Sequence, residues 1–366
     1  MKNRHTHLDV ITALRGIAAL GVVFFHVRIF LWVGWNEIQS SPHEYSRFDH
    51  FASWFSIPTP FLGEGVLLFF VISGFCIHFP QVGKPQNLNI RQYAVRRFFR
   101  IYPPYAIAIG FSMLAVYCLP WADISQQSWI QSLCLIQNYF PSANSQITSN
   151  MSLWSIPTEV EFYIAYPMML ILANRFGAFP SVLLLISVTI ISVVLYFYGN
   201  TRLAFSSFTF YIFWWSGAVL ADLYAKNKLP FPGAIPFLLA VACLTVGLLQ
   251  YVFKFTPFLS SRLFFGIFCV LLLWFSISYF SDIAFNDFKL GKIILILGEM
   301  SYSLYLIHYP LLQIFGYIWV EEYGSKPTNF FVPVMFVLFS VLCAYVFYCL
   351  FEKPFHVLGK KLSAKV

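Results

Sequence analysis

Long, continuous runs of apolar residues separated by short polar segments dominate this 366-residue chain. A run of about 20 apolar residues can cross the hydrocarbon core of a bilayer as a helix. A strand of a membrane barrel would instead alternate apolar and polar positions. The pattern therefore predicts an all-α, polytopic integral membrane helix bundle of about ten transmembrane helices, at 9–33, 61–80, 101–120, 153–173, 180–199, 203–225, 231–252, 259–281, 293–319 and 329–352.

The composition supports a membrane protein. Apolar residues make up 59% of the chain and charged residues only 10%, whereas a soluble domain is about 45–50% apolar and about 25% charged. An aromatic content of 20% excludes a disordered chain. The net charge of +8 comes from short basic clusters between apolar runs, which is typical of membrane topology rather than of nucleic-acid binding.

The basic clusters also predict the topology. With the N-terminus in the cytoplasm, most of the 23 Lys and Arg residues fall on the cytoplasmic side, as the positive-inside rule requires. Both termini are therefore predicted to be cytoplasmic. No linker or internal repeat interrupts the chain, so residues 1–366 are predicted to form a single transmembrane domain with no appended soluble domain. The seven cysteines form no CxxC pair, and no metal site is predicted.

Arg15 and His26 lie inside the first predicted span. Eleven residues correspond to three helical turns plus about 20°, so the two side chains share one face and stand roughly 16 Å apart along the axis. An arginine at this depth costs about 2.5–3.5 kcal/mol, so it should face a wet cavity or an anionic partner. The alternative is a snorkelling Arg15 and a His26 that bonds a neighbouring carbonyl.

Two further spans carry polar side chains. Glu159 and Glu161 lie at the start of the fourth span. Their side chains diverge by about 200° on a helix, so at most one of them faces a given cavity. Glu159 is narrowly favoured as that residue. It could orient His26, accept a proton or lie in the membrane interface. Tyr302, Tyr305 and His308 can share a face of the ninth span and are candidates for lining a substrate cavity. A hydrogen-bonded core histidine is the alternative for His308.

Three arginines, Arg96, Arg97 and Arg100, precede a proline pair that is predicted to begin the third span. Arg97 and Arg100 are adjacent on a helix surface, a geometry suited to holding a phosphate by charge-assisted hydrogen bonds. Topological anchoring or contact with anionic lipids explains the cluster equally well. The chain has no Walker loop, GxSxG elbow or HExxH motif, so P-loop ATPases, ordinary serine hydrolases and zincins are not indicated.

Six segments resemble, in order, the motifs of the membrane-integral acyltransferase 3 family, whose members O-acylate sugars of bacterial surface polysaccharides. They are LRGIAALGVVFFH (14–26), GVLLFFVISGFCI (65–77), RRFFRIYPPY (96–105), SLWSIPTEVEFY (152–163), MSYSLYLIHYPLL (300–312) and FEKPF (351–355). The chain departs from the family at Thr12 and Leu67, where many members have an acidic residue. Those two positions cannot form the same ionic contacts here.

The resemblance implies an enzyme that works across the bacterial inner membrane. Arg97 and Arg100, with Arg96 and Ser73 of the neighbouring motifs, would bind a cytoplasmic acyl-CoA, most often acetyl-CoA. Arg15 would steady this donor or polarise its thioester carbonyl.

The same resemblance places the chemistry at His26, with Glu159 as a catalytic partner. His26 would act either as general base or as a transient acyl carrier, and the acceptor would be a polysaccharide or glycolipid. No permanently bound cofactor and no nucleic-acid partner is implied, and the oligomeric state is open. A secondary transporter or flippase would also place Arg, His and Glu in its spans, but no inverted repeat supports that alternative.

Overall fold

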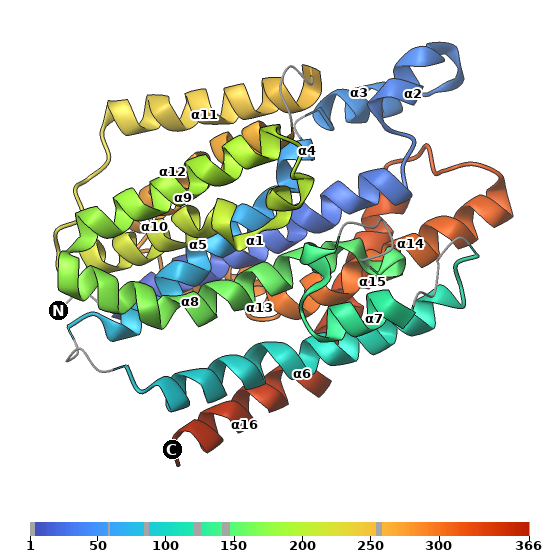
Figure 1. Cartoon of the computed structure of the whole chain (residues 1–366). Helices are drawn as coiled ribbons and strands as arrows, with labels where there is room; N and C mark the ends of the chain where they lie inside the picture. The colour runs from blue at the N-terminus through green and yellow to red at the C-terminus, as the bar shows by residue number, and fades with distance from the viewer. Residues whose placement is uncertain are drawn as a thin grey trace.

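The structure, a computed structural model, describes residues 4–57, 59–83, 88–120, 126–140, 147–253 and 258–365. All regular elements in these ranges are helical, which confirms the predicted fold class (Figure 1). The α-helices are α1 Arg4–Phe30, α2 Gly34–Ser40, α3 Arg47–Phe55, α4 Thr59–Leu62, α5 Gly65–His78, α6 Ile90–Val116, α7 Gln126–Leu133, α8 Ser155–Phe176, α9 Ala178–Phe197, α10 Ser207–Ala225, α11 Ala234–Phe253, α12 Phe258–Tyr279, α13 Lys289–Glu299, α14 Ser301–Tyr323, α15 Phe331–Phe347 and α16 Lys353–Ser363. Short 3-10 segments connect several of them, and a π-helical turn, η8 (Tyr348–Glu352), joins α15 to α16.

The number of membrane spans differs from the prediction. Within the described ranges, eight helical stretches are long and apolar enough to cross a membrane, and the bent pair α13–α14 would make nine. The segment predicted at 61–80 corresponds to α5, which has only 14 residues because α4 and the turn after it precede Gly65. The chain is thus a multi-pass membrane protein, and the predicted count of ten is not confirmed.

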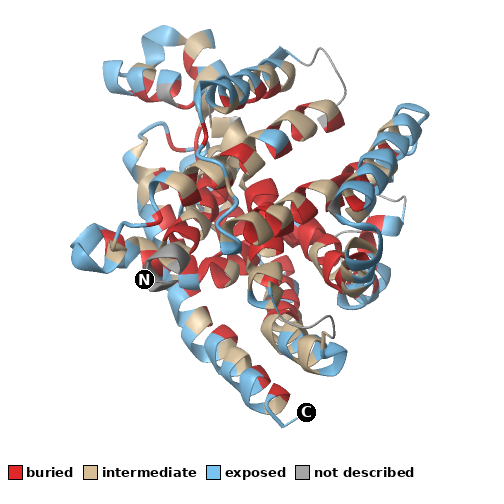
Figure 2. Cartoon of the chain, turned by 90° about the vertical axis from the view of Figure 1, so that its left-hand side faces the viewer, coloured by how far each residue is buried: buried red, intermediate tan, exposed pale blue. Residues whose placement is uncertain are grey.

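Residues facing away from the bundle are largely apolar, as lipid contact requires. Figure 2 shows buried residues gathered at the centre and exposed residues on the outer faces of the peripheral helices. Ile190 and Ile191 of α9, and Ile235 and Leu238 of α11, are among the exposed large apolar residues. The N-terminal end of α1 lies at the same end of the bundle as α16, opposite α2 and α3 (Figure 1). That this end faces the cytoplasm stays a prediction.

The predicted span 293–319 is divided in the structure. Helices α13 and α14 meet at Met300 and are bent by 74°. A residue distant in sequence caps the start of α14. The carboxylate of Glu352 accepts hydrogen bonds from Ser303 N at 3.0 Å and from Ser303 Oγ at 2.5 Å. A carboxylate at a helix N-terminus satisfies free backbone N–H groups and complements the helix dipole.

Two helix crossings at glycine bring the central helices into backbone contact. At the crossing of α1 with α13, a Cβ on Gly298 would lie 1.9 Å from Thr12 O. At the crossing of α5 with α10, a Cβ on Gly74 would lie 1.8 Å from Trp214 O, and one on Gly217 would lie 1.9 Å from Val71 O. Any larger residue would therefore separate the helices, as at small-residue contacts in other membrane bundles.

Helix α6 begins earlier than the sequence predicted. The Pro103–Pro104 pair was expected to start this span, but the helix runs continuously from Ile90 through both prolines. Each proline removes one backbone N–H, which leaves a carbonyl one turn earlier without its usual donor but does not end the helix. As a result Arg97 and Arg100 belong to the same rigid helix as the membrane-embedded residues that follow.

A buried ion pair joins the start of α5 to α12. Arg262 Nε lies 3.3 Å from Glu64 Oε1, and both side chains are only 6% exposed. Arg262 also donates to Ala204 O at 2.9 Å, and its guanidinium lies 4.5 Å from the centre of the Trp154 ring. This side chain therefore ties together four separate segments of the bundle.

Replacing Arg262 by alanine is expected to lower the free energy of unfolding by about 3–5 kcal/mol, because it leaves the Glu64 carboxylate buried without its partner. Reversible unfolding in detergent micelles measures this change. Lys226→Ala is the matched control, since it breaks a pair with Asp222 in which the lysine is 51% exposed, and a loss of about 0–1 kcal/mol is expected. Equal losses in the two variants would contradict this assignment.

Candidate active site

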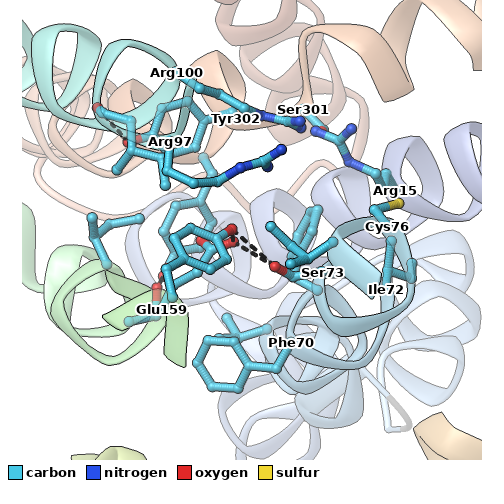
Figure 3. A pocket seen from close by; sticks show the side chains of 18 residues that line it. Arg15, Phe70, Ile72, Ser73, Cys76, Arg97, Arg100, Glu159, Ser301 and Tyr302 are labelled. Carbon is cyan, nitrogen blue, oxygen red and sulfur yellow. Dashed lines mark hydrogen bonds between the residues drawn. The ribbon is translucent and has the colours of Figure 1, made fainter. Parts of the chain in front are cut away.

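A cavity between α1, α5, α6, α8 and α14 collects most of the residues singled out from the sequence (Figure 3). Its volume is about 70 Å³. Seven of the predicted residues line it, namely Arg15, Ser73, Arg97, Arg100, Glu159, Tyr302 and Tyr305. Residues from five helices that are far apart in sequence thus share one cavity.

Three arginine side chains point into the same part of this cavity. Figure 3 shows the guanidinium groups of Arg15, Arg97 and Arg100 converging from α1 and α6. In the described part of the chain none of them lies within 4.0 Å of a carboxylate oxygen. Three half-buried cations without an ion-pair partner repel one another, so the arrangement favours an anionic ligand.

Local contacts hold Arg15 and Arg97 in place. Arg15 Nη2 donates to Ser301 Oγ at 3.0 Å, and the α1–α13 glycine crossing brings these two residues together. The Arg97 guanidinium lies 5.9 Å from the ring centres of Tyr93 and of Tyr163, and its Nε is buried without a hydrogen-bond partner. Stacking therefore positions Arg97 while leaving hydrogen-bond donors available for a ligand.

Arg96 does not belong to this cluster. Its Nε donates to Ser363 Oγ of α16 at 2.8 Å, and Arg96 does not line the cavity. Consecutive residues on a helix point about 100° apart, so Arg96 and Arg97 face different neighbours. The expectation that Arg96 contributes to the same ligand site is not met by its position.

Glu159 lies on the opposite wall of the cavity in a network of hydroxyl groups. Its Oε1 accepts hydrogen bonds from Ser73 Oγ at 3.0 Å and from the hydroxyl of Tyr163. Trp214 Nε1 donates to Ser73 Oγ at 3.3 Å, across the α5–α10 crossing. Glu161, as the helical geometry predicted, is not among the residues that line the cavity.

One of the three alternatives for Glu159, a pairing with His26, is not observed. His26 is bonded instead to a second histidine: His26 Nδ1 lies 3.1 Å from His308 Nε2 and 2.9 Å from Val22 O. His308 is fully buried and does not line the cavity, contrary to the expectation for it. No hydrogen bond joins Glu159 of α8 to His26 of α1 among the described residues, so Glu159 does not orient this imidazole.

Tyr305 separates the cavity from the histidine pair. It lines the cavity, and its ring centre is 5.8 Å from that of His308. The Tyr305 hydroxyl lies 2.5 Å from Ser152 O and 2.7 Å from Ser155 Oγ. The Tyr302 hydroxyl donates to Ile101 O at 3.0 Å. These hydrogen bonds fix the two tyrosines in the cavity wall.

Four residues of the site were not identified from the sequence: Cys76, Tyr163, Ser301 and Glu352. Tyr163 follows Glu159 by one helical turn, so the helical period could have placed both on the same face. Ser301 and Glu352 act through the break between α13 and α14, which the continuous apolar pattern does not reveal. Among the described residues, no group of three or more His, Cys, Asp and Glu residues is arranged to hold a metal ion.

Comparison of the sequence with known protein families shows the family of this chain. The model of the acyltransferase 3 family, described as an acyltransferase domain, matches residues 8–349. The chain belongs to the acyltransferase 3 family. The match includes all the cavity-lining residues named above, and it confirms the resemblance given by the six sequence segments. That the whole chain forms one domain stays a prediction.

Several curated proteins align with most of this chain. The putative peptidoglycan O-acetyltransferase YrhL of Bacillus subtilis is 25% identical over 402 residues, covering 97% of this chain and 56% of the relative. The O-acetyltransferase OatA of Staphylococcus aureus is 24% identical, covering 98% and 58%. The peptidoglycan O-acetyltransferase OatA of Listeria monocytogenes is 28% identical, covering 84% and 50%. The chain thus spans about half the length of these relatives, and no solved structure matches it.

Proposed function

We propose that this chain is an O-acetyltransferase of the bacterial inner membrane. It would transfer an acetyl group from cytoplasmic acetyl-CoA to a hydroxyl group of a glycan in the cell envelope. The observation that carries this proposal is the cluster of Arg15, Arg97 and Arg100 in one cavity, whose wall includes Tyr305 beside the His26–His308 pair. The names of the relatives support acetyl as the group and peptidoglycan as the first acceptor to test.

The donor would bind through its phosphate groups. A coenzyme A carries several phosphate charges, and arginine guanidinium groups bind phosphate oxygens by pairs of charge-assisted hydrogen bonds. The three converging arginines have no carboxylate within ion-pair distance in the described ranges, so bound phosphates would relieve their mutual repulsion. The apolar wall formed by Val66, Phe69 and Phe70 would then contact the thioester arm.

His26 would act as the general base. A sugar hydroxyl is a weak nucleophile at neutral pH, and imidazole is the side chain that accepts its proton in this range. As the hydroxyl oxygen attacks the thioester carbonyl, His26 takes the proton. When the carbon–sulfur bond breaks, His26 returns that proton to the departing thiolate, so the products are the acetyl ester and free coenzyme A.

No observation in the structure favours the transporter alternative. A transporter would place its central polar residues on discontinuous helices in two related halves of the chain. The bent pair α13–α14 is a single break among the described spans, and its polar residues belong to the cavity described above.

Mass spectrometry of acceptor glycans tests the proposal directly. Purified protein in lipid nanodiscs is incubated with acetyl-CoA and, separately, with peptidoglycan fragments, lipid-linked sugars and envelope polysaccharides. The proposal predicts a gain of one acetyl group on one acceptor class together with release of free coenzyme A. Folded protein that acetylates none of these, with acetyl-CoA or succinyl-CoA as donor, would contradict it.

The position of Cys76 gives a test of the donor site that does not need the acceptor. Cys76 is half-buried and lines the cavity with the three arginines. In a variant that retains only this cysteine, saturating coenzyme A is expected to slow alkylation by a small thiol reagent about tenfold or more, by occupying the cavity. The control is a second variant that retains only Cys343 of α15, which is equally half-buried but does not line the cavity, and its alkylation should be unaffected by coenzyme A. Equal rates for Cys76 with and without coenzyme A would place the donor elsewhere.

A further inference from the structure

The hydrogen bonds of the histidine pair determine which nitrogen of each ring carries hydrogen. His26 Nδ1 lies 2.9 Å from Val22 O, and a carbonyl oxygen can only accept a hydrogen bond. His26 Nδ1 therefore carries a hydrogen. The same nitrogen lies 3.1 Å from His308 Nε2. Two N–H groups cannot face each other at this distance, so His308 Nε2 accepts with its lone pair.

The second nitrogen of His308 agrees with this assignment. His308 Nδ1 lies 2.8 Å from Tyr305 O and 3.0 Å from Leu304 O, which are both acceptors. A neutral imidazole has one N–H, and here it is on Nδ1. His308 is therefore neutral, and its lone pair faces His26. In this arrangement the single hydrogen on each Nδ1 is shared between two acceptors.

The second ring nitrogen of His26, Nε2, keeps its lone pair unshared. In neutral His26 the hydrogen is on Nδ1, so Nε2 is unprotonated, and it has no hydrogen-bond partner among the described residues. We propose that His308 is a positioning residue that keeps His26 in the Nδ1-protonated tautomer and thereby makes Nε2 the nitrogen that accepts the proton of the acceptor hydroxyl. This inference rests on the proposed function for its catalytic consequence but not for the tautomer itself.

Val22 O and His308 Nε2 both accept from His26 Nδ1. As an i−4 carbonyl in α1, Val22 O already accepts the backbone N–H of His26. No other group in the described chain donates a hydrogen bond to the Nε2 lone pair of His308. During the reaction His26 becomes an imidazolium. The lone pair on Nε2 of neutral His308 then accepts a hydrogen bond from Nδ1–H of His26, and no proton passes to His308. Its role is like that of the carboxylate that orients the histidine of a catalytic triad, with a neutral acceptor in its place.

The position of His308 is fixed by a buried network on α14. Pro310 has no N–H and leaves Leu306 O without its helical donor, and Asn150 Nδ2 supplies the missing hydrogen bond at 2.9 Å. Asn150 Nδ2 also donates to Ser112 Oγ at 3.0 Å. The Tyr309 ring meets the His26 ring edge-on at 4.9 Å between centres. Both imidazoles are thus held by packing as well as by their hydrogen bond.

Kinetics of two substitutions test the catalytic part of the inference. His308→Leu removes the acceptor and is expected to lower kcat about 10- to 100-fold, the range for loss of a hydrogen bond to a charged group, with KM for acetyl-CoA unchanged. His308→Gln keeps a side-chain oxygen that can accept from His26 and should recover most of the lost kcat. His50→Gln, at a half-buried histidine of α3 that does not line the cavity, is the control and should retain wild-type kcat. Wild-type kcat in His308→Leu would overturn the inference.

Nitrogen-15 NMR of histidine-labelled protein tests the tautomer without reference to activity. His26→Gln identifies the His26 signals. The inference predicts that wild-type His26 shows a protonated Nδ1 and an unprotonated Nε2, and that His308→Leu shifts the ring towards a mixture of tautomers. Wild-type His26 protonated at Nε2 would overturn it, even if His308 variants fail to fold. If the tautomer is as predicted but the wild type transfers no acetyl group, the proposed function fails and the tautomer assignment stands.

Discussion

Replacing Arg97 and Arg100 together by glutamine is expected to weaken acetyl-CoA binding at least about 100-fold. Each guanidinium would form charge-assisted hydrogen bonds to phosphate oxygens, and a hydrogen bond to a charged group contributes about 1.5–3 kcal/mol. Glutamine keeps hydrogen-bonding capacity but removes the charge. Isothermal titration of purified protein with acetyl-CoA measures the affinity directly.

The neighbouring arginine provides a matched control for this experiment. Arg96 lies in the same basic cluster of α6 but donates to Ser363 of α16 and does not line the cavity. Arg96→Gln should therefore bind acetyl-CoA with wild-type affinity. If the double variant retains wild-type affinity, or if Arg96→Gln loses as much as the double variant, the three-arginine cluster is not the donor site and the basic residues act in topology or lipid contact.

The second large effect is expected at His26. His26→Gln should lower the rate of acetyl transfer about 100- to 10,000-fold, the usual contribution of a general base, while acetyl-CoA affinity stays unchanged. The two effects separate because His26 lies roughly 16 Å from Arg15 along α1 and outside the residues that line the cavity. Single-turnover rates and titration of the same preparation give both quantities.

A control for stability accompanies the His26 variant. The His26 ring packs edge-on against Phe25 and Tyr309, so unfolding in detergent must be compared with the wild type. A variant with wild-type unfolding and wild-type transfer would remove His26 from the mechanism. A variant that also loses acetyl-CoA affinity would place His26 in donor binding.

The parts of the site that the sequence predicted correctly depend on local geometry. The spacing of Arg15 and His26 places them on one face because α1 is a single uninterrupted helix from Arg4 to Phe30. Arg97 and Arg100 converge because residues three apart are neighbours on a helix. Glu159 lines the cavity and Glu161 does not, as the helical angle between them requires.

The parts that were missed depend on contacts between distant segments. The bend between α13 and α14 is stabilised by Glu352, which is separated from Ser303 by 49 residues, and the apolar pattern of 293–319 is continuous across it. The His26–His308 pair requires that α1 packs against α14, which no local pattern specifies. The same is true of the glycine crossings, because glycine in an apolar helix has no distinctive period.

The donor and acceptor halves of the proposed reaction meet at the inner wall of the cavity. Arg15 and Tyr305 line the same cavity, and the Tyr305 ring centre lies 5.8 Å from that of His308. A donor held by its phosphates at the arginines would direct its thioester towards this wall. The central claim is therefore that one bound donor connects the arginine cluster to the histidine pair.

A cryo-electron microscopy structure of the protein with a non-hydrolysable thioether analogue of acetyl-CoA tests that claim most directly. The account predicts phosphate density within hydrogen-bonding distance of Arg15, Arg97 and Arg100, and the acetyl end of the analogue next to Tyr305 on the His26 side. Density for the analogue at any other surface, with the arginine cavity empty, would contradict the account.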